Sequence, residues 1–112
     1  MPTGLIVDDN TDEVLALSEV FRQRGFSVET AGDLDSARTV LSRRMPEVAI
    51  LDERVGGEDT LAMLADLDLS GVVDIYLMSD NRSVEAATRA MQLGISDYFP
   101  KPVDSQRLAA HL

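Results

Sequence analysis

Short runs of apolar residues alternate along the chain with longer segments in which apolar residues recur every three or four positions. The runs are rich in β-branched and aromatic residues and are bounded by turn residues, a pattern typical of strands. Five runs have this character, at residues 4–7, 26–30, 48–51, 72–78 and 95–99. The first, third and fourth runs are almost continuously apolar, which predicts strands buried on both faces.

The segments between the runs have the periodicity of amphipathic helices. The positions that mark the first two helices are Val14, Leu17 and Phe21, and then Leu34, Ala37, Val40 and Leu41. Residues 59–67 and 82–93 predict two further helices. Gly25, Gly71 and Gly94 stand where helices should end, because glycine tolerates left-handed backbone angles.

Alternating helices and buried strands predict a parallel sheet covered by helices on both faces. Right-handed crossovers leave few topologies, and a five-stranded doubly wound α/β sheet is the favoured one. A length of 112 residues suits one domain. A fifth helix begins at Asp104 and is cut at Leu112. We therefore expect one domain over residues 1–112, whose last helix either continues in the natural protein or was trimmed.

Composition removes several classes of function. Without cysteine, disulfide frameworks, thiolate chemistry, Cys-ligated zinc and iron–sulfur clusters are excluded. The single histidine, His111, nearly excludes Ser-His-Asp catalysis. The net charge of -10 disfavours direct contact with nucleic acid or an anionic membrane. No signal peptide is recognisable, and no apolar run approaches the ~20 residues that cross a bilayer, so we expect a cytoplasmic protein.

Polar residues stand at the predicted carboxyl ends of the strands, where doubly wound sheets bind ligands. They are Asp8, Asp9, Asp52, Ser79 and Lys101. Three carboxylates in one pocket repel one another unless a cation is present, and Mg²⁺ prefers carboxylate and carbonyl oxygens together with water. With the metal bound, one carboxylate can attack a phosphoryl group while the metal, the lysine and the hydroxyl offset the developing charge.

Four segments together resemble the receiver domain of bacterial two-component response regulators, the CheY-like domains. They are residues 5–9 (LIVDD), 50–52 (ILD), 77–79 (LMS) and 97–102 (DYFPKP). Their order and spacing follow the family over essentially the whole chain. The resemblance implies a flavodoxin-like sheet with strand order 2-1-3-4-5. It also implies a signalling switch that is no enzyme in the ordinary sense, since it catalyses only its own phosphorylation and dephosphorylation.

The same resemblance implies a role for each matching residue. Asp52 is the phosphoryl acceptor and a ligand of Mg²⁺. Asp8 and Asp9 hold the metal directly or through water, and the backbone carbonyl of Arg54 completes the site.

The remaining matches concern charge neutralisation and switching. Lys101 would pair with the phosphoryl group, and the bond from Lys101 to Pro102 is often cis in this family. Ser79 would hydrogen-bond the phosphoryl group when the domain switches on. Tyr98 matches the aromatic residue that turns inward as this hydroxyl moves.

Partners follow from the resemblance as well. A sensor histidine kinase would donate the phosphoryl group. The face formed by the fourth helix, fifth strand and fifth helix would then change its affinity for a second copy, an output domain or a partner protein. Residues 83–102 are similar to receivers of transcription regulators that carry an ATPase and a DNA-binding domain, which implies control of transcription through a part outside this domain.

The chain departs from the family pattern after Asp52. Gly56 stands where a proline is usual and Thr60 where a glycine is usual. The Gly56-Gly57 pair should loosen this loop, and Arg54 could lean over the phosphoryl group. This irregular loop supports an alternative function, a receiver-like scaffold that binds partners without being phosphorylated.

Two other classes fit less well. A haloacid-dehalogenase-type phosphatase needs a second aspartate where Arg54 stands. A flavodoxin-like FMN carrier would have to bind the phosphate of FMN at its first loop, and the acidic residues of that loop here would repel it. The residues without an assigned function are His111, expected on a solvated helix surface, and Met63, Met78 and Met91, expected in the core.

Overall fold

The computed structural model describes residues 1–69, 71–80 and 84–112. The sheet strands are β1 (Thr3–Val7), β2 (Ser27–Ala31), β3 (Val48–Asp52), β6 (Asp74–Ser79) and β7 (Asp97–Pro100). Two further strands, β4 (Arg54–Val55) and β5 (Glu58–Asp59), form a small hairpin. The helices are α1 (Thr11–Gln23), α2 (Leu34–Arg43), α3 (Thr60–Leu67), α4 (Val84–Gln92) and α5 (Ser105–His111).

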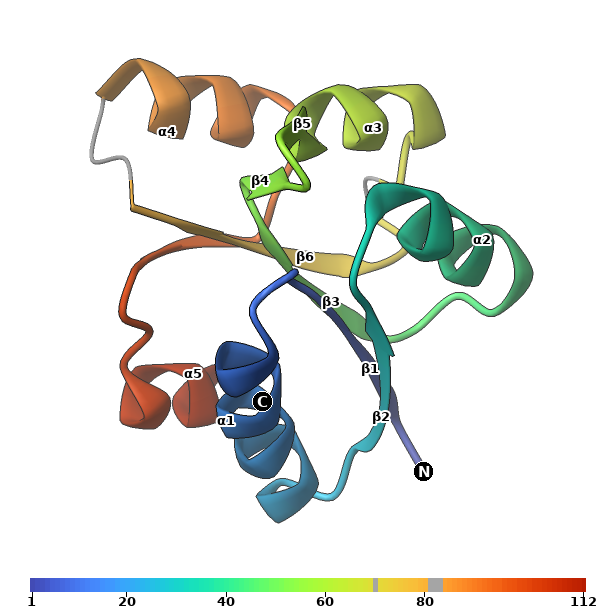
Figure 1. Cartoon of the computed structure of the whole chain (residues 1–112), viewed down its shortest axis with the longest axis vertical. Coiled ribbons are helices and arrows are strands. Elements are labelled where there is room, and N and C mark those ends of the chain that lie inside the picture. Colours follow the sequence, from blue (N-terminus) through green and yellow to red (C-terminus); the bar gives the residue numbers. More distant parts are fainter. Residues whose placement is uncertain (70, 81–83) are drawn as a thin grey trace.

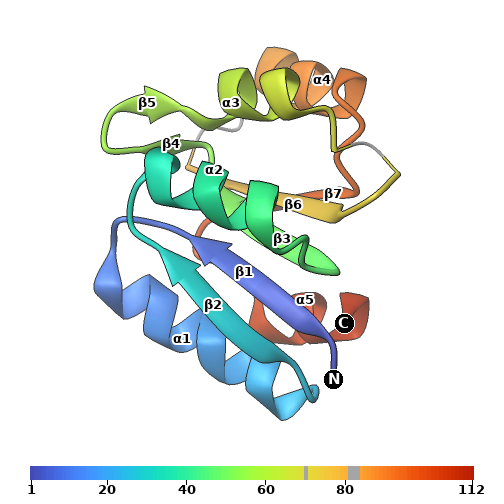
Figure 2. The same cartoon turned by 90° about the vertical axis from the view of Figure 1, so that its right-hand side faces the viewer.

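The main sheet has the order β2-β1-β3-β6-β7, and all its strand pairs are parallel. Leaving out the hairpin, this is the predicted order 2-1-3-4-5, so the doubly wound five-stranded fold is confirmed. Helices α1 and α5 cover one face of the sheet, and α2, α3 and α4 cover the other (Figures 1 and 2).

Each face of the sheet has its own core, because side chains alternate along a strand. Ile6 and Ile50 pack toward α1 and α5, whereas Leu5 and Leu51 pack toward the other three helices. These four side chains are fully buried. The central strands β1, β3 and β6 are thus buried on both faces, as their apolar runs predict.

Register brings the strand ends together at one edge. Val7 at the end of β1 lies opposite Leu51 in β3. Asp52 pairs with Met78 in β6, and Ser79 pairs with Pro100 in β7. Every residue that directly follows these strands therefore emerges on the same side of the molecule.

Several element boundaries differ from the sequence prediction by one or two residues; the fifth strand, for example, begins at Asp97 and not at Ile95. The fourth strand begins at Asp74 and not at Val72, whose side chain is exposed. Helix α3 ends before Asp68, which takes the left-handed conformation at its C-cap (φ 47°), so the assignment of this role to Gly71 is wrong. The predicted start of the next helix, at residue 82, lies outside the described residues.

One side-chain assignment is also wrong. Met91 of α4 is 59% exposed and is not part of the core. His111 is exposed at the end of α5, as predicted, although its Nε2 also lies 2.7 Å from Asp97 Oδ2 and its ring contacts those of Tyr76 and Phe99. None of the helices in the described ranges combines the length and apolar character needed to cross a membrane.

Candidate functional site

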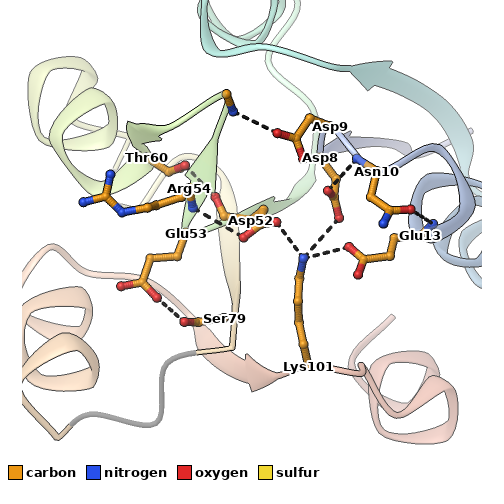
Figure 3. A network of polar contacts seen from close by, with 11 residues as sticks. Asp8, Asp9, Asn10, Glu13, Asp52, Glu53, Arg54, Thr60, Ser79 and Lys101 are labelled. Atoms are coloured by element: carbon orange, nitrogen blue, oxygen red, sulfur yellow. Dashed lines mark hydrogen bonds and ion pairs between the residues drawn. The ribbon is translucent and has the colours of Figure 1, made fainter.

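The chemistry-bearing residues meet at the carboxyl edge of the sheet (Figure 3). Asp8 follows β1, Asp52 ends β3, Ser79 ends β6 and Lys101 follows β7. The side chain of Lys101 extends across the edge toward the ends of β1 and β3. Residues that are far apart in the sequence thus share one site because parallel strands all end at the same edge.

Lys101 is the centre of this cluster. Its Nζ donates to Asp52 Oδ2 at 2.6 Å and to Glu13 Oε2 at 2.7 Å, and it lies 3.5 Å from Asp8 Oδ2. Burial of the ammonium opposes its charge, but the hydrogen bonds to Asp52 and Glu13 outweigh that effect and raise the pKa of Lys101. Lys101 is therefore charged at neutral pH. The peptide bond from Lys101 to Pro102 is cis.

Asp8 is the most buried acid of the cluster, with 1% of its surface exposed. Its Oδ1 accepts a hydrogen bond from the backbone N–H of Asn10 at 3.0 Å, whereas its buried Oδ2 accepts none from any described donor. Burial, together with a proton that Asp8 can share with Glu13, raises the pKa of Asp8 to about 7. The same shared proton and the contact with Lys101 lower the pKa of Glu13.

These features fit a divalent cation. Asp8, Glu13 and Asp52 each offer a carboxylate oxygen, and these oxygens lie within 4.8 Å of one another. A buried carboxylate oxygen without a donor is a ready ligand, and oxygen ligands of this kind suit Mg²⁺. Glu13 is absent from the sequence prediction, and only its place one turn into α1, beside Asp8, could have suggested it.

Asp9 and Arg54, the other two predicted metal ligands, lie beside this cluster. Asp9 is exposed, and its Oδ2 accepts a hydrogen bond from the backbone N–H of Gly56 at 2.9 Å. The backbone N–H of Arg54 lies 3.4 Å from Asp52 Oδ1. The guanidinium of Arg54 turns away from Asp52 and donates to the carbonyl of Gly57 at 2.9 Å (Figure 3).

The loop after Asp52 is a hairpin and not the loosened segment expected from its glycines. Gly56 and Gly57 both have positive φ angles, 60° and 79°, the backbone of a tight two-residue turn between antiparallel strands. Thr60, which stands where the family usually has glycine, donates its hydroxyl to the carbonyl of Asp52 at 2.5 Å. The unusual residues of this segment thus fix its shape and tie it to Asp52.

Ser79 lies on the opposite side of Asp52 from Lys101. It is 3% exposed, and its hydroxyl donates to Glu53 Oε2. Asp52, Glu53 and Ser79 together line a cavity of about 160 Å³. Sequence reasoning did not single out Glu53, because no pattern shows where its flexible side chain points.

Tyr98 lies outside the acidic cluster. It is half-buried in β7 and lines a groove of about 740 Å³ against α4, together with Val84, Met91 and Pro100. Val84 is 80% exposed. The predicted aromatic switch therefore borders the α4 side of the face that the resemblance assigns to signalling.

The fold and the cluster at the strand ends are those expected of a receiver-type signalling domain, and comparison with known proteins agrees. The family model for the response regulator receiver domain matches residues 5–112. The chain belongs to this family, and the resemblance drawn from its sequence motifs is confirmed.

Individual relatives match nearly the whole of this chain, but the match covers different shares of their own length. AlgB of Pseudomonas aeruginosa, an alginate biosynthesis transcriptional regulatory protein, is 31% identical over 109 residues, which cover 95% of this chain and 24% of AlgB. The chain thus spans about a quarter of the length of that relative. A response regulator receiver protein from Pseudomonas putida has a TM-score of 0.87 at 30% identity, covering 97% of this chain and 93% of the other.

A solved structure of a response regulator from Burkholderia pseudomallei is also similar. Its TM-score is 0.88 at 25% identity, and the match covers 98% of this chain and 65% of that one. That crystal structure contains a phosphorylated aspartic acid, a calcium ion and citrate.

Proposed function

We propose that this receiver domain is a switch that accepts a phosphoryl group on Asp52. The observation that carries the proposal is the contact of 2.6 Å between Lys101 Nζ and Asp52 Oδ2, beside a buried Asp8 oxygen that pairs with Lys101 at 3.5 Å but accepts no hydrogen bond from a described donor. A nucleophilic carboxylate, a fixed ammonium and free metal-binding capacity are what phosphoryl transfer to an acid requires.

The reaction follows from these groups. An oxygen of Asp52 attacks the phosphorus of a phosphohistidine on a sensor histidine kinase. The new P–O bond forms as the P–N bond breaks, and the electron pair of that bond stays on the imidazole nitrogen. The product is an aspartyl phosphate, whose added negative charge Lys101 offsets. Attack of water on the phosphorus later returns the carboxylate and inorganic phosphate.

Mg²⁺ is the cofactor we propose. Asp8, Asp9, Asp52 and the backbone carbonyl of Arg54 would hold it, and Glu13 adds a carboxylate on the side of Lys101. When bound, the metal supplies positive charge to the phosphoryl oxygens in the transition state. The acidic cluster supports this choice, because oxygen ligands suit a hard cation.

The output we propose is a change in the face formed by α4, β7 and α5. Ser79 would move to the phosphoryl group, and Tyr98 would turn with it, which shifts the population between two conformations. That face would then bind an output domain, a partner protein or a second copy of the chain. Similarity to a transcriptional regulatory protein supports transcription as the controlled process. A cytoplasmic location belongs to this proposal and rests on the sequence alone.

The alternative is a receiver-like scaffold that binds partners without phosphorylation. The β4–β5 hairpin favours it, because this element departs from the family pattern beside the phosphoryl acceptor. The scaffold needs neither Mg²⁺ nor an accessible Asp52 carboxylate, so a phosphoryl mimic distinguishes the two functions.

Beryllofluoride, which mimics a phosphoryl group on a carboxylate, provides the test. In Mg²⁺, we expect wild type to bind it with changes in the amide NMR signals of Ser79, Tyr98 and α4. Asp52→Asn should show no changes, whereas Asp12→Asn, which alters an exposed acid on α1, should respond like wild type. A folded wild type without any response would support the scaffold.

A further inference from the structure

Glu53 occupies a position from which it competes for the hydroxyl of Ser79. It directly follows Asp52, and its backbone N–H donates to the carbonyl of Met78 at 2.8 Å, which fixes its Cα beside β6. Its side chain extends to Ser79, which donates a hydrogen bond to Glu53 Oε2 (Figure 3). Nothing in the family resemblance assigns a role to this residue.

The competition arises from the chemistry of a hydroxyl. Ser79 has one proton to donate, and a carboxylate is a strong acceptor because it is charged. The proposed active state requires the same proton to reach a phosphoryl oxygen on Asp52. Since Asp52, Glu53 and Ser79 line the same cavity of about 160 Å³, both acceptors lie within the reach of one side chain.

We infer that Glu53 is a positioning residue that holds the Ser79 hydroxyl in the unphosphorylated state and thereby opposes switching. A phosphoryl group on Asp52 adds a charge of about -1.5 to -2, which repels the neighbouring Glu53 carboxylate. That repulsion releases the hydroxyl to the phosphoryl group. This inference rests on the proposed function and names a residue that sets how readily the switch turns on.

The test is the affinity for beryllofluoride in saturating Mg²⁺, measured by amide NMR titration. Glu53→Ala removes the competing acceptor, so we expect it to bind about tenfold more tightly than wild type, the value of one charge-assisted hydrogen bond. Glu53→Gln has the same shape without the charge, and its affinity for beryllofluoride should lie between those of wild type and Glu53→Ala. Glu58→Ala removes an exposed glutamate of the nearby hairpin, and its affinity should stay within about twofold of wild type.

A second background separates positioning from simple repulsion. In Ser79→Ala there is no hydroxyl to hold, so adding Glu53→Ala should relieve only the charge repulsion and tighten binding by much less than tenfold. A tenfold gain that persists without Ser79 would overturn the inference, because Glu53 would then act only through its charge. Equal affinities of wild type, Glu53→Ala and Glu53→Gln would overturn it too.

Failure of the proposed function has a different signature. If folded wild type and all variants ignore beryllofluoride, Asp52 is no phosphoryl acceptor, and the inference falls with it. If wild type binds beryllofluoride but the Glu53 variants bind it with the same affinity, only the inference fails. Should Glu53→Ala not fold, the comparison between Glu53→Gln and wild type decides alone.

Discussion

At the scale of single residues, the site holds more negative than positive charge. Asp8, Glu13 and Asp52 surround the ammonium of Lys101, and one ammonium cannot neutralise three carboxylates. In metal-free protein, burial and a proton shared with Glu13 raise the pKa of Asp8 to about 7, and protonation of Asp8 relieves part of this excess. A bound cation would take the place of this proton.

Stability should therefore depend on pH through Asp8. Its pKa is raised from 3.8 to about 7, so between these values the folded protein binds more protons than the unfolded chain, and stability falls as pH rises. Asp8→Asn has no carboxyl group at this position and therefore does not lose stability in this way. In EDTA, we predict that its free energy of unfolding exceeds that of wild type by a margin that grows from about pH 4 to pH 7 and then levels off.

Urea denaturation at a series of pH values measures this margin. Asp12→Asn is the control, because it removes one negative charge at an exposed position in the first turn of α1. Its offset from wild type should not grow over that pH range. If the stability advantage of Asp8→Asn over wild type stays constant or shrinks toward neutral pH, the pKa of Asp8 is not raised in the folded protein.

The sequence could predict site residues only where a strand end fixes their position. Asp8, Asp52, Ser79 and Lys101 follow or end strands, so topology alone brings them to one edge. Glu13 and Glu53 belong to the same site through the reach of long side chains. That reach depends on tertiary neighbours, which a single sequence does not show.

At the scale of elements, close packing of α1 on β1 depends on a missing side chain. Phe21 of α1 is fully buried, and a Cβ at Gly4 of β1 would overlap its ring. The ring also packs edge-on against Phe26, with ring centroids 5.4 Å apart. Phe21 therefore has little room to move away from β1.

We predict that Gly4→Ala destabilises the domain by about 1–3 kcal/mol, the usual effect of overpacking a core. The midpoint of urea unfolding measures it. Gly32→Ala is the matched control, because no described atom lies within 4 Å of the added Cβ, and it should change stability by less than about 0.5 kcal/mol. Equal losses in the two variants would argue against the contact with Phe21.

Elements were predicted well where periodicity is strong and poorly where short-range turn geometry decides. The apolar runs locate all strands of the main sheet. The β4–β5 hairpin was missed because two residues per strand give no pattern, although paired glycines are a known turn signal. The end of α3 was misplaced because Asp68 adopts a backbone conformation that favours glycine.

At the scale of the whole molecule, the fold separates the proposed phosphorylation site from the proposed signalling face. The acidic cluster lies at the carboxyl edge of the sheet (Figure 3), whereas the groove lined by Tyr98 and Met91 lies between β7 and α4. Ser79 at the end of β6 neighbours Pro100 in β7, so one strand pair connects the two regions. The proposed phosphorylation at the edge would thus reach the groove through neighbouring strands.

The central claim is that Asp52 accepts a phosphoryl group in a reaction that needs Mg²⁺. Intact mass spectrometry after incubation with phosphoramidate tests it most directly. We predict that wild type gains one phosphoryl group in Mg²⁺ and none in EDTA, and that Asp52→Asn gains none in either. Asp80→Asn alters another acid that lines the cavity beside Asp52, and it should gain one phosphoryl group in Mg²⁺ like wild type. An equal gain in Asp52→Asn, or no gain in folded wild type that also ignores beryllofluoride, would contradict the claim.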